Sequence, residues 1–172
     1  MRIAYPEITT APGVEMQYKY DVLRQAGNKR YARKADDKNI HLVAIKFTNL
    51  TDQEIDFGKD VEILAGNVAI APLHPDVVKR EVKQMSGLYM LWSLFWVTIT
   101  KCEGDDCSVT PIPVGLLIGI ANTAGASGAN KNFGRELDYH NLMDKVIKPG
   151  ETVKGLLAIR TQTDQPLQIR LK

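Results

Sequence analysis

Alternation of apolar and polar residues marks the first part of the chain as β-strand. Residues 13–23, GVEMQYKYDVL, place an apolar side chain at every second position. This period of two is typical of a strand with one face in the core and the other in water. The alternation returns over 39–50 and, after a run of turn-forming residues, over 55–66. The pattern predicts neighbouring strands with a polar connection.

The C-terminal end of the chain repeats this pattern. Residues 145–161 contain Pro149 and Gly150, which favour a turn, between two apolar runs. Residues 166–172 alternate again, with Leu167, Ile169 and Leu171 on one face. Short alternating strands at both ends predict a mainly β fold, an antiparallel β-sandwich.

Between the two β regions the apolar period becomes helical. Residues 75–85 place valines at helical spacing, with Asp76 in the first turn and basic residues toward the end, as the helix dipole favours. A short amphipathic helix is expected there. Residues 131–145 predict a helical or mixed segment with Phe133, Leu137 and Leu142 facing inward.

The segment from Met85 to Thr100 is sixteen residues without a charge and contains both tryptophans of the chain. A membrane-spanning helix needs about twenty apolar residues, so this segment is short for that role. Its first part is rich in Leu, Met and Trp and favours helix, whereas its final residues, VTIT, favour an extended chain. We expect a buried helix that runs into an extended segment near the cysteines.

A second charge-free segment follows over 107–130. Pro113 excludes helix before it and suits the first position of a helix after it. Small residues then recur four apart, a spacing that allows another helix to approach closely. The expected helix-packing positions are Gly115, Gly119 and Gly125, the last paired with Ala129.

Together these two segments predict an antiparallel helical hairpin joined by a short loop that contains the cysteines. The expected organisation is one domain, 1–172, in which 72–140 form a largely helical apolar insertion within the β-sandwich. Three interpretations of the hairpin stay open: it enlarges the core, it contacts lipid, or it forms an interface with a protein partner or a second copy. The expected contact residues are Tyr89, Trp92, Phe95 and Trp96.

The overall charge argues against a nucleic-acid partner. The 172 residues carry a formal net charge of +2, far from the broad positive field that a phosphate backbone requires. Residues 23–39 do hold six basic side chains around Tyr31. We interpret them as a solvated loop between two strands, with nucleic-acid binding as the alternative.

Cys102 and Cys107 flank EGDD and are the only cysteines. Their spacing suits neither a redox dithiol with two intervening residues nor a zinc site with four ligands. A local disulfide across a turn is one interpretation, and two free thiols the other. The carboxylates between them indicate a solvated acidic turn rather than a dedicated calcium loop. No metal and no cofactor is therefore expected.

Catalytic motifs do not emerge from the sequence. His41, His74 and His140 have no neighbouring residues of the kind that metal or acid–base motifs require. The glycine-rich segment 115–130 has neither the dinucleotide fingerprint nor the lysine of a phosphate loop. No catalytic residue is expected, and a hydrolase or transferase with a site assembled from distant residues is the alternative function.

Residues 41–57, HLVAIKFTNLTDQEIDF, together with 144–161 and the final PLQIRLK, resemble immunoglobulin-like sandwich domains of uncharacterised bacterial envelope proteins. The apolar middle of the chain resembles the insertion of some predicted lipoproteins. The resemblance implies an exported protein of the cell envelope, periplasmic or outer-membrane associated, with no known activity. The N-terminal residues contain no apolar segment typical of a signal peptide, so we expect a mature start.

Overall fold

A computed structural model describes residues 4–84, 97–103, 106–112 and 114–172, giving the backbone alone over 97–124. The chain divides into two compact units. The β unit comprises residues 1–83 and 133–172, and the inserted unit comprises residues 84–132. Each is described by itself below.

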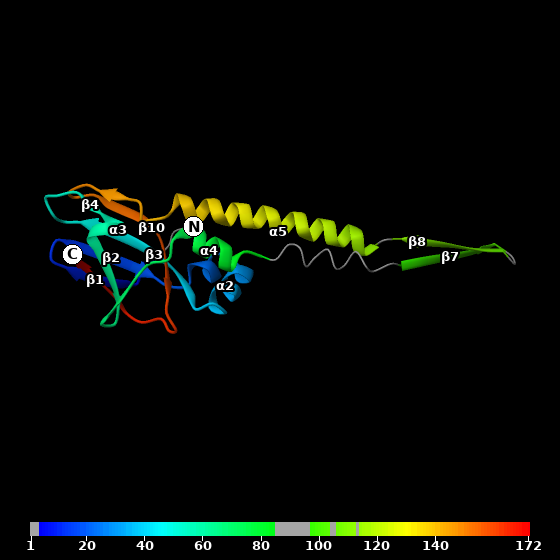
Figure 1. Ribbon diagram of the computed structural model, residues 1–172, viewed down its shortest axis with the longest axis horizontal. Coiled ribbons are helices and arrows are strands. Elements are labelled where there is room, and N and C mark those ends of the chain that lie inside the picture. Colours follow the sequence, from blue (N-terminus) through cyan, green and yellow to red (C-terminus); the bar gives the residue numbers. More distant parts are fainter. Residues whose placement is uncertain (1–3, 85–96, 104–105, 113) are drawn as a thin grey trace. The chain divides into compact units, whose positions relative to one another are not determined.

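The larger sheet of the β unit has four antiparallel strands (Figure 1). Its strands are β1 Glu7–Ala11, β2 Val14–Lys19, β3 Ile40–Asn49 and β10 Thr152–Arg160, and they are adjacent in that order. β3 is an inner strand, with Phe47 opposite Met16 on one side and Val153 on the other. Strands from the two ends of the chain therefore build one sheet.

A smaller antiparallel sheet also joins distant parts of the chain. Its strands are β5 Val61–Ala65, β6 Val68–Ile70 and β11 Leu167–Leu171, with β5 in the centre. A further short pair joins β4 Ile55–Asp56 to β9 Val146–Ile147. The expectation of a mainly β fold with antiparallel sheets is confirmed.

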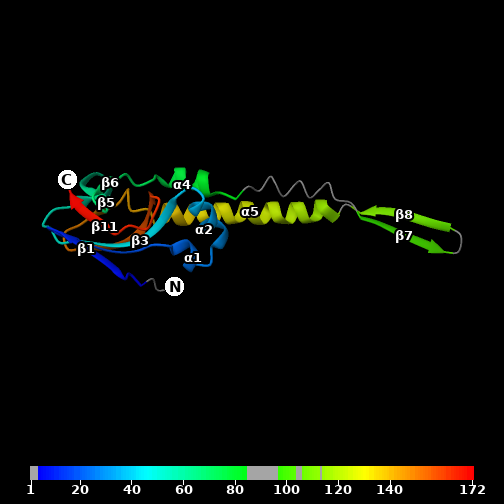
Figure 2. The ribbon, with the colours of Figure 1, turned by 90° about the horizontal axis from the view of Figure 1, so that it is seen from below.

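Both sheets contribute to one hydrophobic core. Alternate residues of β2 and β3, such as Met16 and Phe47, are fully buried, and so is Ile63 of β5. Phe47 contacts Phe57 edge to face, with ring centroids 5.2 Å apart. Figure 2 shows β5 and β6 above β1 and β3. Burial on facing sheets follows from the period of two in the sequence.

Two sequence expectations for this unit are wrong. The strand expected over 55–66 is interrupted by a helical turn, α3 Phe57–Asp60, which buries Phe57. The loop expected over 23–39 instead contains two helices, α1 Val22–Gln25 and α2 Lys29–Asp36. The second helix forms because Tyr31, Ala32 and Ala35 share one face and are buried there.

The helix expected over 75–85 is confirmed as α4 Pro75–Val82. Pro75 starts the helix, Asp76 lies in its first turn, and Val78 and Val82 are fully buried. Immediately before it, the Leu73 backbone N–H donates to the Ala158 carbonyl at 2.7 Å. Residues 72–83 therefore pack as part of the β unit rather than of the inserted unit.

The long helix α5 Val114–Tyr139 belongs to both units, since its residues from Phe133 onward lie in the β unit. The ring of Phe133 stacks on Tyr31 with centroids 4.3 Å apart. After the helix, the Leu156 N–H of β10 donates to the His140 carbonyl at 2.6 Å. A Cβ at Gly155 would lie 2.5 Å from that carbonyl oxygen, so glycine permits the close approach.

The inserted unit contains a β-hairpin where a short loop was expected. Its strands are β7 Val97–Glu103 and β8 Asp106–Ile112, paired from Val97 opposite Ile112 to Glu103 opposite Asp106. The extended conformation expected of VTIT is confirmed, and the β-branched residues of both strands explain why the pairing continues. The first arm of the expected helical hairpin, 85–96, lies outside the described residues.

Candidate functional site

A hollow of about 480 Å³ lies on the β unit beside the start of α4. It is bordered by two carboxylates, a lysine and a histidine, the kinds of side chain that perform acid–base chemistry. Its lining residues are Asp56, Gly58, Lys59, Pro72, His74, Met143 and Asp144.

The carboxylate and the lysine at one side of the hollow form an ion pair. Lys59 Nζ lies 2.5 Å from Asp56 Oδ2, and the Asp56 backbone N–H donates to Asp60 Oδ2 at 2.7 Å. The hydrogen bond from Lys59 lowers the pKa of Asp56, and the same bond raises the pKa of Lys59. Both shifts favour the charged forms, so neither group is suited to exchanging protons near neutral pH.

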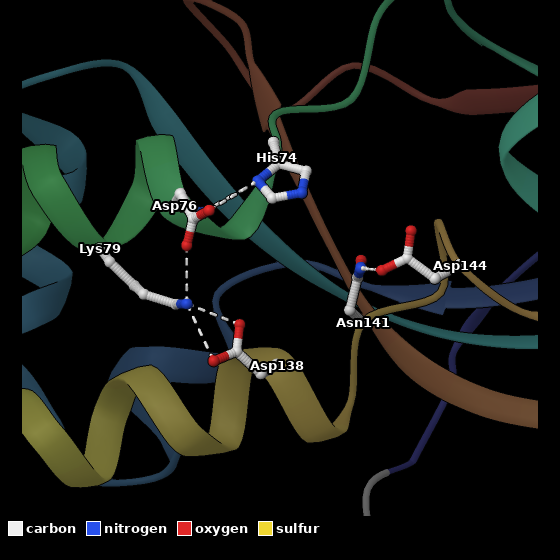
Figure 3. Close-up of polar contacts among 6 residues, drawn as sticks. All are labelled: His74, Asp76, Lys79, Asp138, Asn141 and Asp144. Atoms are coloured by element: carbon white, nitrogen blue, oxygen red, sulfur yellow. Dashed lines mark hydrogen bonds and ion pairs between the residues drawn. The ribbon is translucent and has the colours of Figure 1, made fainter.

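His74 caps the N-terminus of α4 (Figure 3). Its Nδ1 accepts a hydrogen bond from the Asp76 backbone N–H at 3.2 Å and lies 3.5 Å from Asp76 Oδ2. A ring nitrogen that accepts from a helix N–H replaces the oxygen that usually caps a helix. This contact gives His74 a structural role.

Lys79 connects α4 to the C-terminal turns of α5. Its Nζ lies 2.8 Å from Asp76 Oδ1 and 2.6 Å from Asp138 Oδ1. The hydrogen bonds to Asp138 and Asp76 raise the pKa of Lys79, and Lys79 in turn lowers the pKa of Asp76. Figure 3 shows Asn141 and Asp144 as a separate pair, with Asn141 Nδ2 donating to Asp144 Oδ2 at 2.7 Å.

The remaining histidines also make local contacts. His41 Nδ1 lies 2.8 Å from Asp164 Oδ1, and its Nε2 lies 3.1 Å from the Thr161 carbonyl oxygen. Tyr20 packs against the same ring and donates to the Gln165 carbonyl at 2.7 Å. Burial raises the pKa of Tyr20, and nearby Tyr18 and Asp164 add to the shift. These contacts fix residues 161–165 against β3.

His140 immediately follows α5. Its Nε2 is 3.5 Å from Glu136 Oε2 of that helix, and its ring contacts Tyr139 edge to face. Both partners are exposed. The three histidines thus serve three separate local contacts, and the described side chains do not bring two of them to one site.

The structure places only part of the sequence-predicted contact surface. Tyr89, Trp92, Phe95 and Trp96 lie outside the described residues. Gly115 and Gly119 lie on α5, and their role in helix packing stays a prediction.

Gly125 also lies on α5 and is exposed. A Cβ built on it meets no described atom within 4 Å. The described residues therefore give no support to close helix packing at Gly125.

Cys102 and Cys107 lie directly opposite each other on β7 and β8. Opposed residues of antiparallel strands have Cα atoms about 4.5–5.5 Å apart, within the range that a disulfide bridges. The strand register therefore allows the expected bond, which stays a prediction.

The charges of the inserted unit are concentrated within residues 101–106, where β7 ends and β8 begins. Among residues 84–132, four of the five charged side chains lie within residues 101–106, and the fifth is Lys131. The rest of the unit comprises two long charge-free segments of the chain.

Sequence reasoning missed one surface, the basic face of α2. Exposed Lys29, Arg30 and Arg33 lie opposite the buried residues of this helix. The helical spacing of Tyr31, Ala32 and Ala35 is the signal that would have located it.

Within the described ranges, no group of three His, Cys, Asp or Glu side chains is placed to bind a metal ion. The helices in those ranges also include none with the length and apolar character to cross a bilayer. Comparison with protein families, with curated proteins and with solved structures finds no match to this chain.

Proposed function

We propose that this protein is a non-enzymatic component of the cell envelope that uses its inserted unit for assembly or membrane-proximal contact. The observation that carries the proposal is the distribution of charge in residues 84–132. These residues form a compact unit of their own, yet their charges are confined to 101–106 and to Lys131.

The small size of the inserted unit also supports a role in contact with a partner. A unit of 49 residues buries a smaller fraction of its surface than a full domain does. The charge-free segment 85–100 contributes both tryptophans and a tyrosine, the residue types that most often anchor interfaces. We infer that Tyr89, Trp92, Phe95 and Trp96 contact a partner, a second copy of the chain, or lipid.

The proposed location rests on the cysteines and on the resemblance to envelope proteins. Opposed cysteines in a two-stranded hairpin are suited to a disulfide, and disulfides persist in exported proteins. We propose that Cys102 and Cys107 are bonded and that the β unit is an immunoglobulin-like sandwich of an exported, lipoprotein-type chain. Its two antiparallel sheets around one core support that arrangement.

The alternative, a hydrolase or transferase, requires an activated nucleophile or a poised acid and base. The hollow beside α4 contains an ion pair whose groups are both held charged, and a histidine that caps a helix. Because these groups have structural partners, the geometry favours the interaction protein.

Single replacements of Trp92 and Trp96 by Ala test the proposal. An interface tryptophan should weaken self-association or vesicle binding and leave the free energy of unfolding of the monomer nearly unchanged. A tryptophan in a core should instead cost about 3–5 kcal/mol of stability. Tyr139→Ala is a matched control, because Tyr139 is 77% exposed on the β unit.

The measurements are sedimentation equilibrium, vesicle flotation and urea unfolding for each variant. The proposal fails if both tryptophan variants lose only stability and the wild-type protein is a monomer that does not bind vesicles. The inserted unit would then be a packing element alone.

A further inference from the structure

The outward face of α2 is positively charged. Lys29, Arg30 and Arg33 occupy positions i, i+1 and i+4, which share one side of a helix, and all three are exposed. The buried residues of the helix lie on the other side, with Tyr31 stacked on Phe133. The helix is therefore fixed to the β unit and presents these cations to solvent.

Three neighbouring charged side chains, Arg24, Lys34 and Asp36, have partners of their own. Arg24 Nη2 lies 2.6 Å from Asp36 Oδ2, and this ion pair neutralises the carboxylate at the end of the helix. Lys34 Nζ donates to the Lys83 carbonyl at 2.8 Å. Among the residues that the structure describes, no carboxylate pairs with Lys29, Arg30 or Arg33.

The positive charge continues onto α4. Lys34 reaches the carbonyl of Lys83, and the side chains of Lys83 and Arg80 are exposed. Lys83 is the last residue of the β unit before the inserted unit, and the charge-free segment begins two residues later. Basic residues beside an apolar segment are typical of chains that contact anionic lipid headgroups.

We propose that the basic face of α2, formed by Lys29, Arg30 and Arg33, binds the anionic headgroups of a phospholipid bilayer. The choice of partner rests on the membrane-proximal form of the proposed function. A convex helix face meets a flat surface through its outermost side chains, and long flexible cations reach phosphate groups without a shaped pocket.

A bilayer fits this face better than a nucleic acid does. Proteins that bind single-stranded nucleic acid combine aromatic side chains, which stack on the bases, with basic side chains that contact the backbone. The only aromatic residue of α2, Tyr31, is buried against Phe133 and cannot stack on a base. The chain also lacks a large positive excess, since its formal net charge is +2.

The test is flotation of the full chain with vesicles of phosphatidylcholine alone and of phosphatidylcholine with phosphatidylglycerol. The variant Lys29→Gln, Arg30→Gln and Arg33→Gln removes the proposed contacts and keeps good helix-forming residues. The control Lys148→Gln, Lys154→Gln and Lys172→Gln removes the same charge at exposed positions of the β unit. Circular dichroism verifies that each variant is folded.

We expect wild-type protein and control to bind the anionic vesicles and the α2 variant to lose roughly a hundredfold in partition coefficient. Wild-type binding should also fall steeply between low and high salt, because salt screens the charges. That salt titration tests the contact without any substitution.

Unchanged flotation of the α2 variant, or equal losses in the α2 variant and the control, overturns the proposal. So does wild-type protein that ignores anionic vesicles at low salt, or that binds single-stranded RNA through α2 and not vesicles. The tryptophan variants separate this result from the proposed function, because they alter the inserted unit and leave α2 intact. Flotation that is lost in the tryptophan variants and unchanged in the α2 variant would support membrane contact through the inserted unit and overturn the proposal for the basic face of α2.

Discussion

Lys79 Nζ lies 2.6 Å from Asp138 Oδ1 and thereby joins α4 to the final turns of α5. Lys79 precedes the inserted unit by a few residues, and Asp138 follows it by a few. Arg160 of β10 adds a contact of 2.8 Å to Glu81 of α4. The β unit therefore holds the chain where it enters and where it leaves the inserted unit.

Replacing Lys79 with Met should lower the free energy of unfolding by about 1 kcal/mol or less, because the ion pairs are partly exposed and water screens them. Urea unfolding measures the change. Lys148→Met is the control, since Lys148 is exposed and, among the residues that the structure describes, it forms hydrogen bonds through its backbone only. A loss as large in the control would show that Lys79 makes no specific contribution.

The stability difference between wild type and Lys79→Met should disappear in acid. Lys79 lowers the pKa of Asp76. A carboxylate with a lowered pKa contributes stability that is present above its unfolded-state pKa, about 3.9, and is lost as pH falls through the folded-state pKa. Unfolding midpoints followed from neutral pH to below about pH 4 should therefore converge. A stability difference between wild type and Lys79→Met that stays constant over that pH range would contradict this role of Asp76.

Asn49 should be among the most sensitive polar positions. Its Nδ2 donates to the carbonyls of Gln53 and Ile147 at 2.7 and 3.0 Å, and its Oδ1 accepts from the Thr51 backbone N–H at 2.9 Å. Asn49→Ala leaves these buried or half-buried groups unpaired and should cost roughly 2–4 kcal/mol in urea unfolding. Asn67→Ala, in the exposed turn between β5 and β6, should change stability by less than about 0.5 kcal/mol.

Two glycines should respond in opposite directions to alanine. A Cβ at Gly155 would lie 2.5 Å from the His140 carbonyl oxygen and from Leu142 Cγ, so Gly155→Ala should destabilise the fold by about 1–3 kcal/mol. Gly125→Ala should stabilise α5 by up to about 1 kcal/mol, because this helical glycine is exposed. Thermal unfolding compares the two. Destabilisation at Gly125 would instead support the close helix packing predicted from the sequence.

Thiol titration of the undenatured, non-reduced protein tests the pairing of Cys102 and Cys107. Their opposed positions predict that neither cysteine reacts until a reductant is added. Protein reduced beforehand is the control and should expose both thiols. Two reactive thiols in the oxidised preparation would contradict the proposed bond.

The period of two located the β regions because each strand has one buried face. β2, β3 and β11 follow directly from alternation, and α4 follows from its valine spacing and its acidic first turn. The pairing of β3 with β10 could not be predicted, because contacts between residues far apart in sequence leave no local signal.

Four features could not be predicted from the sequence, for physical reasons. The short apolar face of α2 lies among the many basic side chains of 23–39, which are typical of a solvated loop. The helix α3 is a single turn inside a segment whose alternation predicts a strand. The charged residues between the cysteines are typical of a loop, whereas the β-branched residues on either side form paired strands. The sequence also gave no signal that His74 caps α4, because serine, threonine, aspartate and asparagine are the usual helix caps.

Quenching of tryptophan fluorescence tests the central claim most directly. Trp92 and Trp96 are the only tryptophans and both lie in the inserted unit, so the signal reports on that unit alone. Acrylamide is titrated into the full chain with and without vesicles, and at low and high protein concentration. We predict that vesicles or self-association protect the tryptophans from quenching and shift their emission to the blue. Equal quenching and unchanged emission under all four conditions would show that the inserted unit contacts neither lipid nor another copy.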